Sequence, residues 1–262
     1  QETIRLANRL SDCLYRYYPA ARHTFKSWPT KIVCHLVCAY STPAALLELD
    51  FVAFQAFARQ HGYTRSNQLQ GCFERLQADY PPAPPALVAA YAGDAVRDAA
   101  LLLQSLTREE QNLRQLQQLF VTHPDHHIFA SLPGAGNWLA PALLVMLGED
   151  RDRFPTHEHL QALAGTCPVT RQSGGTVSIY FRRACDHDFR FIAQQWARAA
   201  VAESNWVKTY YTELRRKHAE NDTLRRVANR LLAILWRIWQ DRTTYDEQVH
   251  QNNRLKHCQR KP

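Results

Sequence analysis

The residues best suited to chemistry stand in the stretch LAGTCPVTRQSG at positions 163–174. Ser173 brings a hydroxyl, and Gly174 beside it allows a tight turn or a close approach of the backbone. Arg171 would hold an anion next to that hydroxyl. A serine in such a loop is a nucleophile, a helix cap or part of a solvated turn, and the loop taken alone favours the solvated turn.

Ser173 needs activation before it can attack, because a serine hydroxyl is a poor nucleophile without a neighbouring base or metal. No histidine and aspartate near it in the sequence have a spacing that would indicate such a base. The other serines of this region are weaker candidates. Ser131 is expected to start a turn, and Ser178 is expected to lie in an extended segment.

A second stretch, SLPGAGNWLAPALLVMLGE at 131–149, has glycines directly before an apolar helix. Gly134 and Gly136 free the backbone to turn sharply, so the amides that begin the next helix, from Asn137 onward, point outward. That geometry suits a phosphate and is the core of a helix-hairpin-helix, which holds the nucleic-acid backbone without reading sequence. The alternative is a plain corner between two helices.

Basic residues follow the serine loop. TVSIYFRRA at 176–184 alternates well enough to be a strand or an extended arm, and it ends in Arg182 and Arg183. Arg190 comes shortly afterwards. WVKTYYTELRRKH at 206–218 interleaves aromatic and basic residues, which either stack on bases or cover the core, and the core is favoured. The whole sequence has a formal net charge of +8 and an isoelectric point near 9.2, as nucleic-acid-binding proteins often do.

The cysteines and histidines do not predict a metal site. The seven cysteines form an odd set without a CxxC pair, which indicates free thiols in a reducing compartment. Cys34, His35 and Cys38 form a CHxxC cluster, and HPDHH at 123–127 adds three histidines. Neither has a standard zinc spacing, so we expect no metal in this chain.

The predicted fold is mainly α-helical, with a helix-hairpin-helix-like element and a short extended segment. Apolar residues recur at helical spacing in 3–18, and again in 86–121 after a run of prolines at 80–86. Further helices are expected at 189–203, 206–218 and 223–240.

Three regions follow from this pattern: a helical connector at 1–126, a compact domain at 127–250 and a basic tail at 251–262. The helix at 86–121 is a coiled-coil candidate, although Glu110 and Gln117 fall where a coiled coil requires apolar residues. No apolar run reaches the length of about 18 residues that spans a bilayer, and no signal peptide is apparent. The sequence begins at Gln1 and its one methionine is Met146, so it is expected to be a fragment.

Taken together, the motifs resemble the C-terminal part of IS110-family transposases, with their IS116/IS110/IS902-type domain. The succession is LPGAG, APALLVMLGED, LAGTCPVTRQSG, RRAC, and finally ANRLLAILWRIW followed by YDE. The resemblance is dense over 127–250, and the ordered succession is more specific than any single motif. Upstream, RLANRLSDCLYRYYPA is similar to the connecting helix that follows the family's catalytic domain.

The resemblance implies a recombinase that acts on double-stranded DNA and is guided by a structured bridge RNA. The family's RuvC-like domain holds Mg²⁺ with a DEDD set of acidic residues, and its C-terminal domain supplies a serine that becomes transiently joined to DNA. That serine corresponds to Ser173. The residues we expect to contact nucleic acid are Arg171, Gly134, Gly136, Asn137, Arg182, Arg183 and Arg190.

The resemblance also implies a homodimer or tetramer, because a recombinase must hold two DNAs at once. The expected location is the bacterial cytoplasm, in association with the nucleoid and not with a membrane.

The sequence departs from the family pattern in places. The family often has a lysine after SG and a more basic stretch after RRAC, whereas this sequence has Gly175 and the DHD of 186–188. The acidic domain has no counterpart here, so we expect Mg²⁺ to be bound elsewhere and the isolated chain to be inactive in recombination. The alternatives are a non-catalytic helical nucleic-acid-binding module, in which Ser173 is structural, and an inactive truncated remnant.

Overall fold

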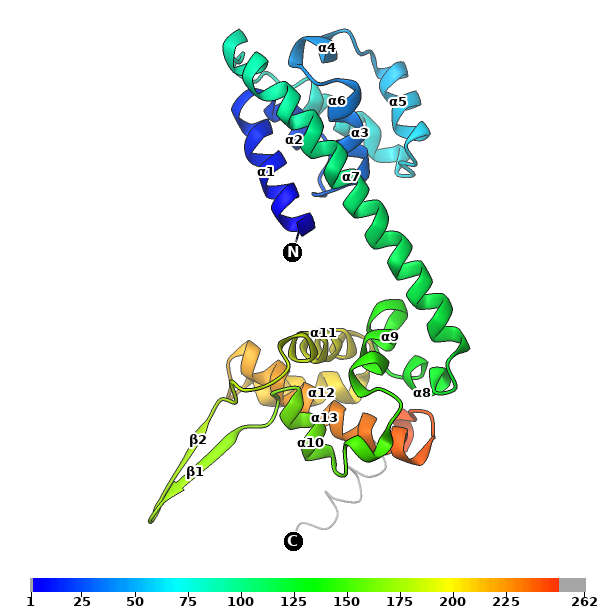
Figure 1. Ribbon diagram of the computed structural model, residues 1–262, viewed down its shortest axis with the longest axis vertical. Helices are drawn as coiled ribbons and strands as arrows, with labels where there is room; N and C mark the ends of the chain where they lie inside the picture. Colours follow the sequence, from blue (N-terminus) through cyan, green and yellow to red (C-terminus); the bar gives the residue numbers. More distant parts are fainter. Residues whose placement is uncertain (1, 250–262) are drawn as a thin grey trace. The chain divides into compact units, whose positions relative to one another are not determined.

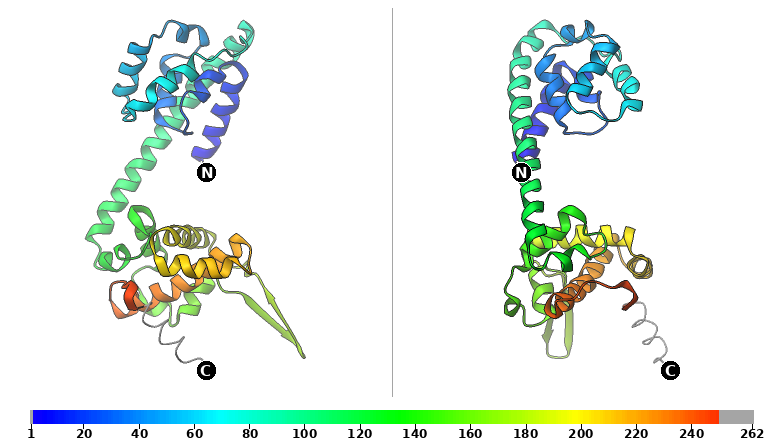
Figure 2. Two further views of the ribbon diagram at one scale, coloured as in Figure 1. Left: turned by 180° about the vertical axis from the view of Figure 1, so that it is seen from behind. Right: turned by 90° about the vertical axis from the view of Figure 1, so that its right-hand side faces the viewer.

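The computed structural model describes residues 2–249 and consists mainly of α-helices, which confirms the predicted fold class (Figures 1 and 2). The predicted basic tail at 251–262 lies outside the described residues. The chain divides into two compact units, Gln1–Asn112 and Leu113–Pro262. No helix in the described part of the chain is long and apolar enough to cross a membrane.

The first unit is a cluster of short helices packed on two longer ones. Its elements are α1 (Glu2–Tyr17), α2 (Pro19–His23), α3 (Lys31–Ala39), α4 (Pro43–Leu47), α5 (Phe51–Gln60), the 3₁₀-helix η1 (Ser66–Gln68), α6 (Leu69–Leu76) and the beginning of α7 (Pro85–Thr122). Leu10, Leu14 and Leu102 lie fully buried in its core. Arg9 of α1 donates to both carboxylate oxygens of Asp98 on α7, and this bond fixes one helix on the other.

The helix α7 begins directly after the proline run. Pro85 is its first residue, a position that proline favours because it has no N–H to satisfy there and its φ is already helical. The division between the two units falls within this helix. The coiled-coil interpretation of α7 and the predicted boundary at 126/127 stay predictions.

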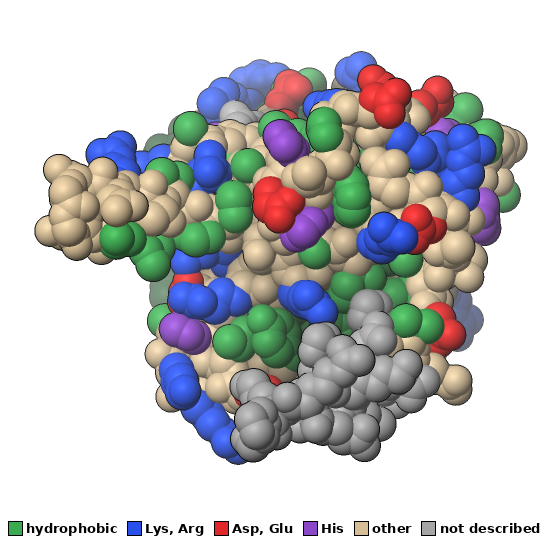
Figure 3. Space-filling view, turned by 90° about the horizontal axis from the view of Figure 1, so that it is seen from below, with side chains coloured by type: hydrophobic (Ala, Val, Ile, Leu, Met, Phe, Trp, Pro, Cys, Tyr) green, Lys and Arg blue, Asp and Glu red, His purple; other side chains and the backbone are tan. Residues whose placement is uncertain are grey.

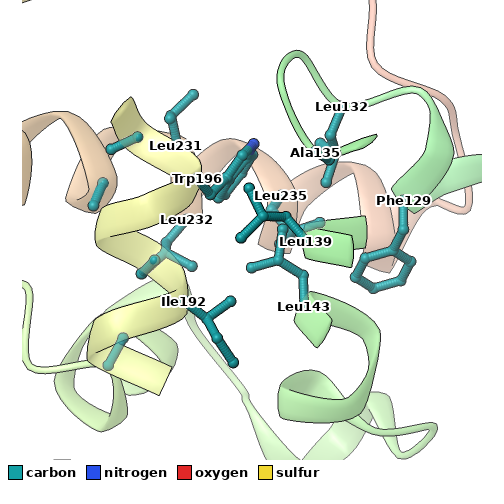
Figure 4. Packing of buried hydrophobic residues seen from close by; sticks show 14 of the residues in the cluster. Phe129, Leu132, Ala135, Leu139, Leu143, Ile192, Trp196, Leu231, Leu232 and Leu235 are labelled. Atoms are coloured by element: carbon teal, nitrogen blue, oxygen red, sulfur yellow. The ribbon is translucent and has the colours of Figure 1, made fainter. Parts of the chain in front are cut away.

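The second unit carries the candidate site. Its further elements are α8 (His126–Ala130), α9 (Gly136–Leu147), η2 (Arg151–Arg153), α10 (His157–Leu163), β1 (Val169–Ser173), β2 (Thr176–Tyr180), α11 (His187–Glu203), α12 (Asn205–Arg215) and α13 (Glu220–Asp241). The stripe of apolar residues on α13 faces inward, as its sequence periodicity predicts. Figure 4 shows Leu231 and Leu235 of α13 packed with Trp196 of α11.

Asp125 ties three segments of the second unit together. This buried carboxylate accepts from Arg151 Nη2 at 2.7 Å and from Trp239 Nε1 at 3.2 Å. Arg151 also donates through Nε to the carbonyl of Trp239 at 2.9 Å, and its guanidinium lies 5.1 Å from the centroid of that indole ring. The start of α8, η2 and the end of α13 are thereby held at fixed positions.

We expect Asp125→Ala to lower the free energy of unfolding of the second unit by about 2–4 kcal/mol, because it leaves Arg151 largely buried without its counter-charge. Asp152→Ala removes an exposed carboxylate from the same turn and is expected to change the free energy by less than about 0.5 kcal/mol. Urea denaturation followed by tryptophan fluorescence measures both. Equal midpoints for the two variants would contradict this role of Asp125.

Candidate nucleic-acid interface

Residues 169–180 form a two-stranded antiparallel hairpin. The prediction of a loop at 163–174 is therefore wrong for the second half of that stretch. Residues 169–173 are the strand β1, which pairs with β2 from Val169–Tyr180 to Ser173–Thr176. The turn consists of Gly174 and Gly175 alone. Gly174 has φ +58°, which a glycine adopts without strain and which a two-residue hairpin turn requires. The predicted extended segment is confirmed as β2.

Ser173 lies at the end of β1, directly before this turn, and its side chain is exposed. Residues two apart on a strand point to the same face, so Ser173 shares a face with Arg171 about 7 Å away. Arg171 pairs across the ladder with Ser178, and its guanidinium lies 5.5 Å from the centroid of the Tyr180 ring. The hairpin thus brings the predicted nucleophile and its predicted anion holder onto one surface.

The other face of the hairpin carries two apolar side chains from β2 beside the polar Thr170 and Gln172 of β1, and all four are exposed. Val177 and Ile179 point away from Ser173, and their side chains are 57% and 71% exposed. Figures 1 and 2 show the hairpin extending away from the helices of its own unit. In Figure 3 it is the arm at the left, with basic and hydrophobic side chains on opposite edges.

The Ser173 hydroxyl has no activating group nearby. In the part of the chain that the structure describes, it takes part in no hydrogen bond, and no cluster of three or more His, Cys, Asp or Glu side chains is arranged to hold a metal ion. No described residue is therefore bonded to this hydroxyl as a general base would be.

The base of the hairpin is fixed by a stack of two cations on one ring. The Arg190 guanidinium carbon lies 4.6 Å from the centroid of the Phe181 ring, and that of Arg225 lies 4.8 Å from it. Arg190 also donates through Nη2 to the carbonyl of Arg182 at 2.6 Å. Arg190, expected to contact nucleic acid, is thus engaged inside the domain as a brace for the hairpin.

The other two predicted arginines differ in environment. Arg183 is exposed, whereas Arg182 is partly buried and its Nε atom has no hydrogen-bond partner among the described residues. Both lie where the hairpin joins the helical part of the unit. We refer to Arg171 of β1 and these two arginines at the base of the hairpin as the basic strip.

Sequence reasoning missed the contribution of α13 to this region. Arg225 stands outside the apolar stripe of α13, but its side chain is only 24% exposed and lies against Phe181. Asp222 accepts from both Arg225 and Arg226, the second bond measuring 2.9 Å. Burial alone raises the pKa of Asp222, but the bond from Arg226 and the neighbouring positive charges outweigh it and lower that pKa below its ordinary value. Asp222 is therefore a carboxylate that orients two guanidinium groups.

The PGAG turn between α8 and α9 is packed tightly against α11. The Gly134 N–H donates to Glu203 Oε2 at 2.8 Å, so this amide is not open to a phosphate. Trp196 Nε1 donates to the carbonyl of Pro133 at 3.0 Å. Gly136 and Asn137 begin α9 and are exposed. The turn lies apart from the hairpin (Figure 1), so the predicted contact residues fall on two separate surfaces.

Comparisons with known proteins match this unit to one family. Residues 126–212, which contain both the PGAG turn and the hairpin, match the model of the transposase IS116/IS110/IS902 family. Over 93% of its length the chain is 28% identical to the "Mini-circle putative transposase for IS117" of Streptomyces coelicolor. Over 95% it is 26% identical to the insertion element IS110 uncharacterized 43.6 kDa protein of the same organism. The chain spans 61% and 62% of the length of these two relatives.

The two glycines of the PGAG turn are expected to respond differently to alanine. A Cβ on Gly134 would meet the backbone of Ala199 and Ala200 at 2.5 Å, whereas a Cβ on Gly136 meets nothing within 4 Å. Both have positive φ, +70° and +49°. Gly136→Ala should therefore cost only the backbone strain, about 1 kcal/mol, and Gly134→Ala several times more.

Thermal unfolding of the two variants tests this difference. If Gly134→Ala were as stable as Gly136→Ala, Gly134 would not be needed for the packing of the turn on α11. Binding of duplex DNA by Gly136→Ala, which should stay folded, then tests the phosphate role of the α9 start separately.

Proposed function

Because this chain belongs to the IS116/IS110/IS902 family of transposases, we propose that it is the DNA-binding and strand-cleaving part of a transposase, with Ser173 as the nucleophile. The chain covers about three fifths of its relatives, so the activity of the whole protein is part of the proposal. The observation that supports it most is the position of Ser173, exposed beside the turn of a projecting hairpin and on one face with Arg171.

The chemistry proposed for Ser173 is a transesterification. Its oxygen attacks the phosphorus of a DNA phosphodiester, the bond to one sugar oxygen breaks, and that oxygen leaves as a hydroxyl with the proton that the serine gave up. One phosphate ester replaces another, so the strand can be rejoined to a new end without an external energy source. Arg171 neutralises a non-bridging oxygen in the ground state and as charge builds in the transition state.

The proton of Ser173 needs an acceptor that this hairpin does not supply. The resemblance assigns activation to Mg²⁺ on an acidic domain, and the described residues contain no set of ligands that fits such an ion. We therefore derive no step through a metal for these residues. The structured guide RNA and the dimeric or tetrameric assembly rest on the resemblance alone and are part of the same proposal.

A non-catalytic nucleic-acid-binding module is the second candidate. It is favoured by one observation, the absence of any hydrogen bond to the Ser173 hydroxyl among the described residues. In that case the basic strip of Arg171, Arg182 and Arg183 would bind DNA, and Ser173 would only shape the end of β1.

The first test compares Ser173→Ala with Ser178→Ala in a longer protein that contains this chain together with the acidic domain. Ser173→Ala is expected to abolish the covalent protein–DNA adduct and strand exchange while DNA binding stays near normal, because one exposed hydroxyl contributes little to charge or packing. Ser178→Ala changes a serine on the same face and should keep the adduct. Denaturing gels detect the adduct, and mass spectrometry locates it. An adduct that persists in Ser173→Ala excludes Ser173 as the nucleophile.

The second test concerns the basic strip. If Arg171, Arg182 and Arg183 each neutralise one phosphate, the logarithm of the DNA association constant should fall with the logarithm of salt concentration at a slope of about −3. Arg183→Ala should reduce the magnitude of that slope by about one, while Arg230→Ala, on a different element, should leave it unchanged. A binding constant that does not change with salt would argue against phosphate contacts altogether.

A further inference from the structure

A pocket of about 410 Å³ opens at the base of the hairpin, between β2, α12 and α13. This volume is within the usual range for a small-molecule site, about 300–1,000 Å³. Its walls come from segments far apart in the sequence. The residues that give it chemical character are Pro168, Tyr180, Tyr210, Arg225, Arg226 and Asn229.

One wall of the pocket is cationic. Asp222 holds Arg225 and Arg226, so the three side chains together carry one net positive charge. Arg226 is bonded to this carboxylate through Nε at 2.9 Å, and its side chain is 47% exposed. Its two terminal nitrogens donate no hydrogen bond to a described residue, so the fork that they form is left for a ligand in the pocket. A fork of this kind is the usual partner of a phosphate.

A second wall is made of rings. Tyr180 is 52% exposed at the end of β2, and Tyr210 is partly buried on α12. Pro168 adds an apolar surface in the connection that leads into β1. The Arg171 guanidinium lies over the Tyr180 ring at 5.5 Å from its centroid, so a base would stack on the other face of that ring. Aromatic rings at a basic surface are typical stacking platforms for nucleobases.

A third wall presents an oriented amide. The side-chain oxygen Oδ1 of Asn229 accepts a hydrogen bond from Thr166 Oγ1 at 2.9 Å. The main-chain carbonyl of Asn229 accepts one from Gln161 Nε2 at 2.7 Å. The bond from Thr166 fixes the oxygen side of this amide, and both N–H groups of Asn229 stay available for a molecule in the pocket. Such groups suit the acceptor atoms on the edge of a base.

We propose that this pocket holds one nucleotide turned out of its stack, with the phosphate at Arg226, the base against Tyr180 and Tyr210, and the edge of the base at Asn229. The proposal rests on the proposed function, namely that this unit binds nucleic acid. An acidic peptide would satisfy the arginines but would leave the rings and the amide without partners. An unpaired nucleotide uses all three walls.

The hairpin sets the distance from this pocket to the cleavage site. Tyr180 and Thr176, the residue paired with Ser173, are four residues apart on β2, which is about 14 Å. Along a stacked strand this corresponds to about four nucleotides. The nucleotide held in the pocket therefore lies about four positions from the phosphate that faces Ser173, and it fixes which phosphate that is.

The test uses two DNA duplexes with the same sequence, one fully paired and one with a single unpaired 2-aminopurine nucleotide. The full chain is expected to bind the second about tenfold more tightly, with a change in 2-aminopurine fluorescence as the base stacks. Tyr180→Ala and Arg226→Ala should remove both the preference and the fluorescence change. Arg226→Lys, which keeps the charge but loses the fork, should restore only part of the preference.

Arg230→Ala is the matched control, because Arg230 is exposed one turn further along α13 and does not line the pocket. It should keep the tenfold preference. Equal, tight binding of both duplexes by the unchanged chain would overturn the pocket proposal and leave the proposed function intact. Failure to bind either duplex would reject the proposed function, and the pocket proposal with it. The same pair of duplexes made of RNA shows whether the nucleotide comes from DNA or from RNA. Tighter binding of the duplex with the unpaired nucleotide supports the proposal in either nucleic acid.

Discussion

The contacts of the Phe181 ring with the guanidinium groups of Arg190 and Arg225 hold the projecting hairpin in place. A two-stranded hairpin is only marginally stable in water by itself, and most side chains of this one are exposed. Its direction is therefore set where it joins the helices. Arg190 comes from α11 and Arg225 from α13, so the position of Ser173 depends on the packing of two helices whose core lies far from the tip.

Much of the scaffold could be predicted from the sequence, because a helix is indicated by the regular spacing of apolar residues within one segment. The apolar stripe of α13, the long helix that became α7 and the extended segment of β2 all follow from the spacing of residues within a single element. The strand β1 was missed because RQSG was interpreted as a loop around a serine. The two glycines after Ser173, flanked by β-branched residues on both sides, are the signal that predicts a hairpin there.

The rest depends on partners that are distant in sequence. Nothing near Gly134 indicates that Glu203, 69 residues later, takes its amide proton. A glycine in such a turn leaves space either for a phosphate or for another helix. Here the backbone of Ala199 on α11 occupies that space. In the same way, the periodicity of α13 identifies Arg225 as outside the apolar stripe, but it does not show that the hairpin returns to cover it.

The two-stranded sheet leaves one edge of each strand without a backbone partner. On β1 the charge of Arg171 discourages another strand from adding to that edge. The segment TVSIYF, which contains β2, has no charge and no proline and presents Val177 and Ile179 to solvent. It has the composition of a segment that pairs with copies of itself. The extension that exposes this arm to a large partner therefore also exposes a segment that can pair with a second copy of itself when no partner covers it.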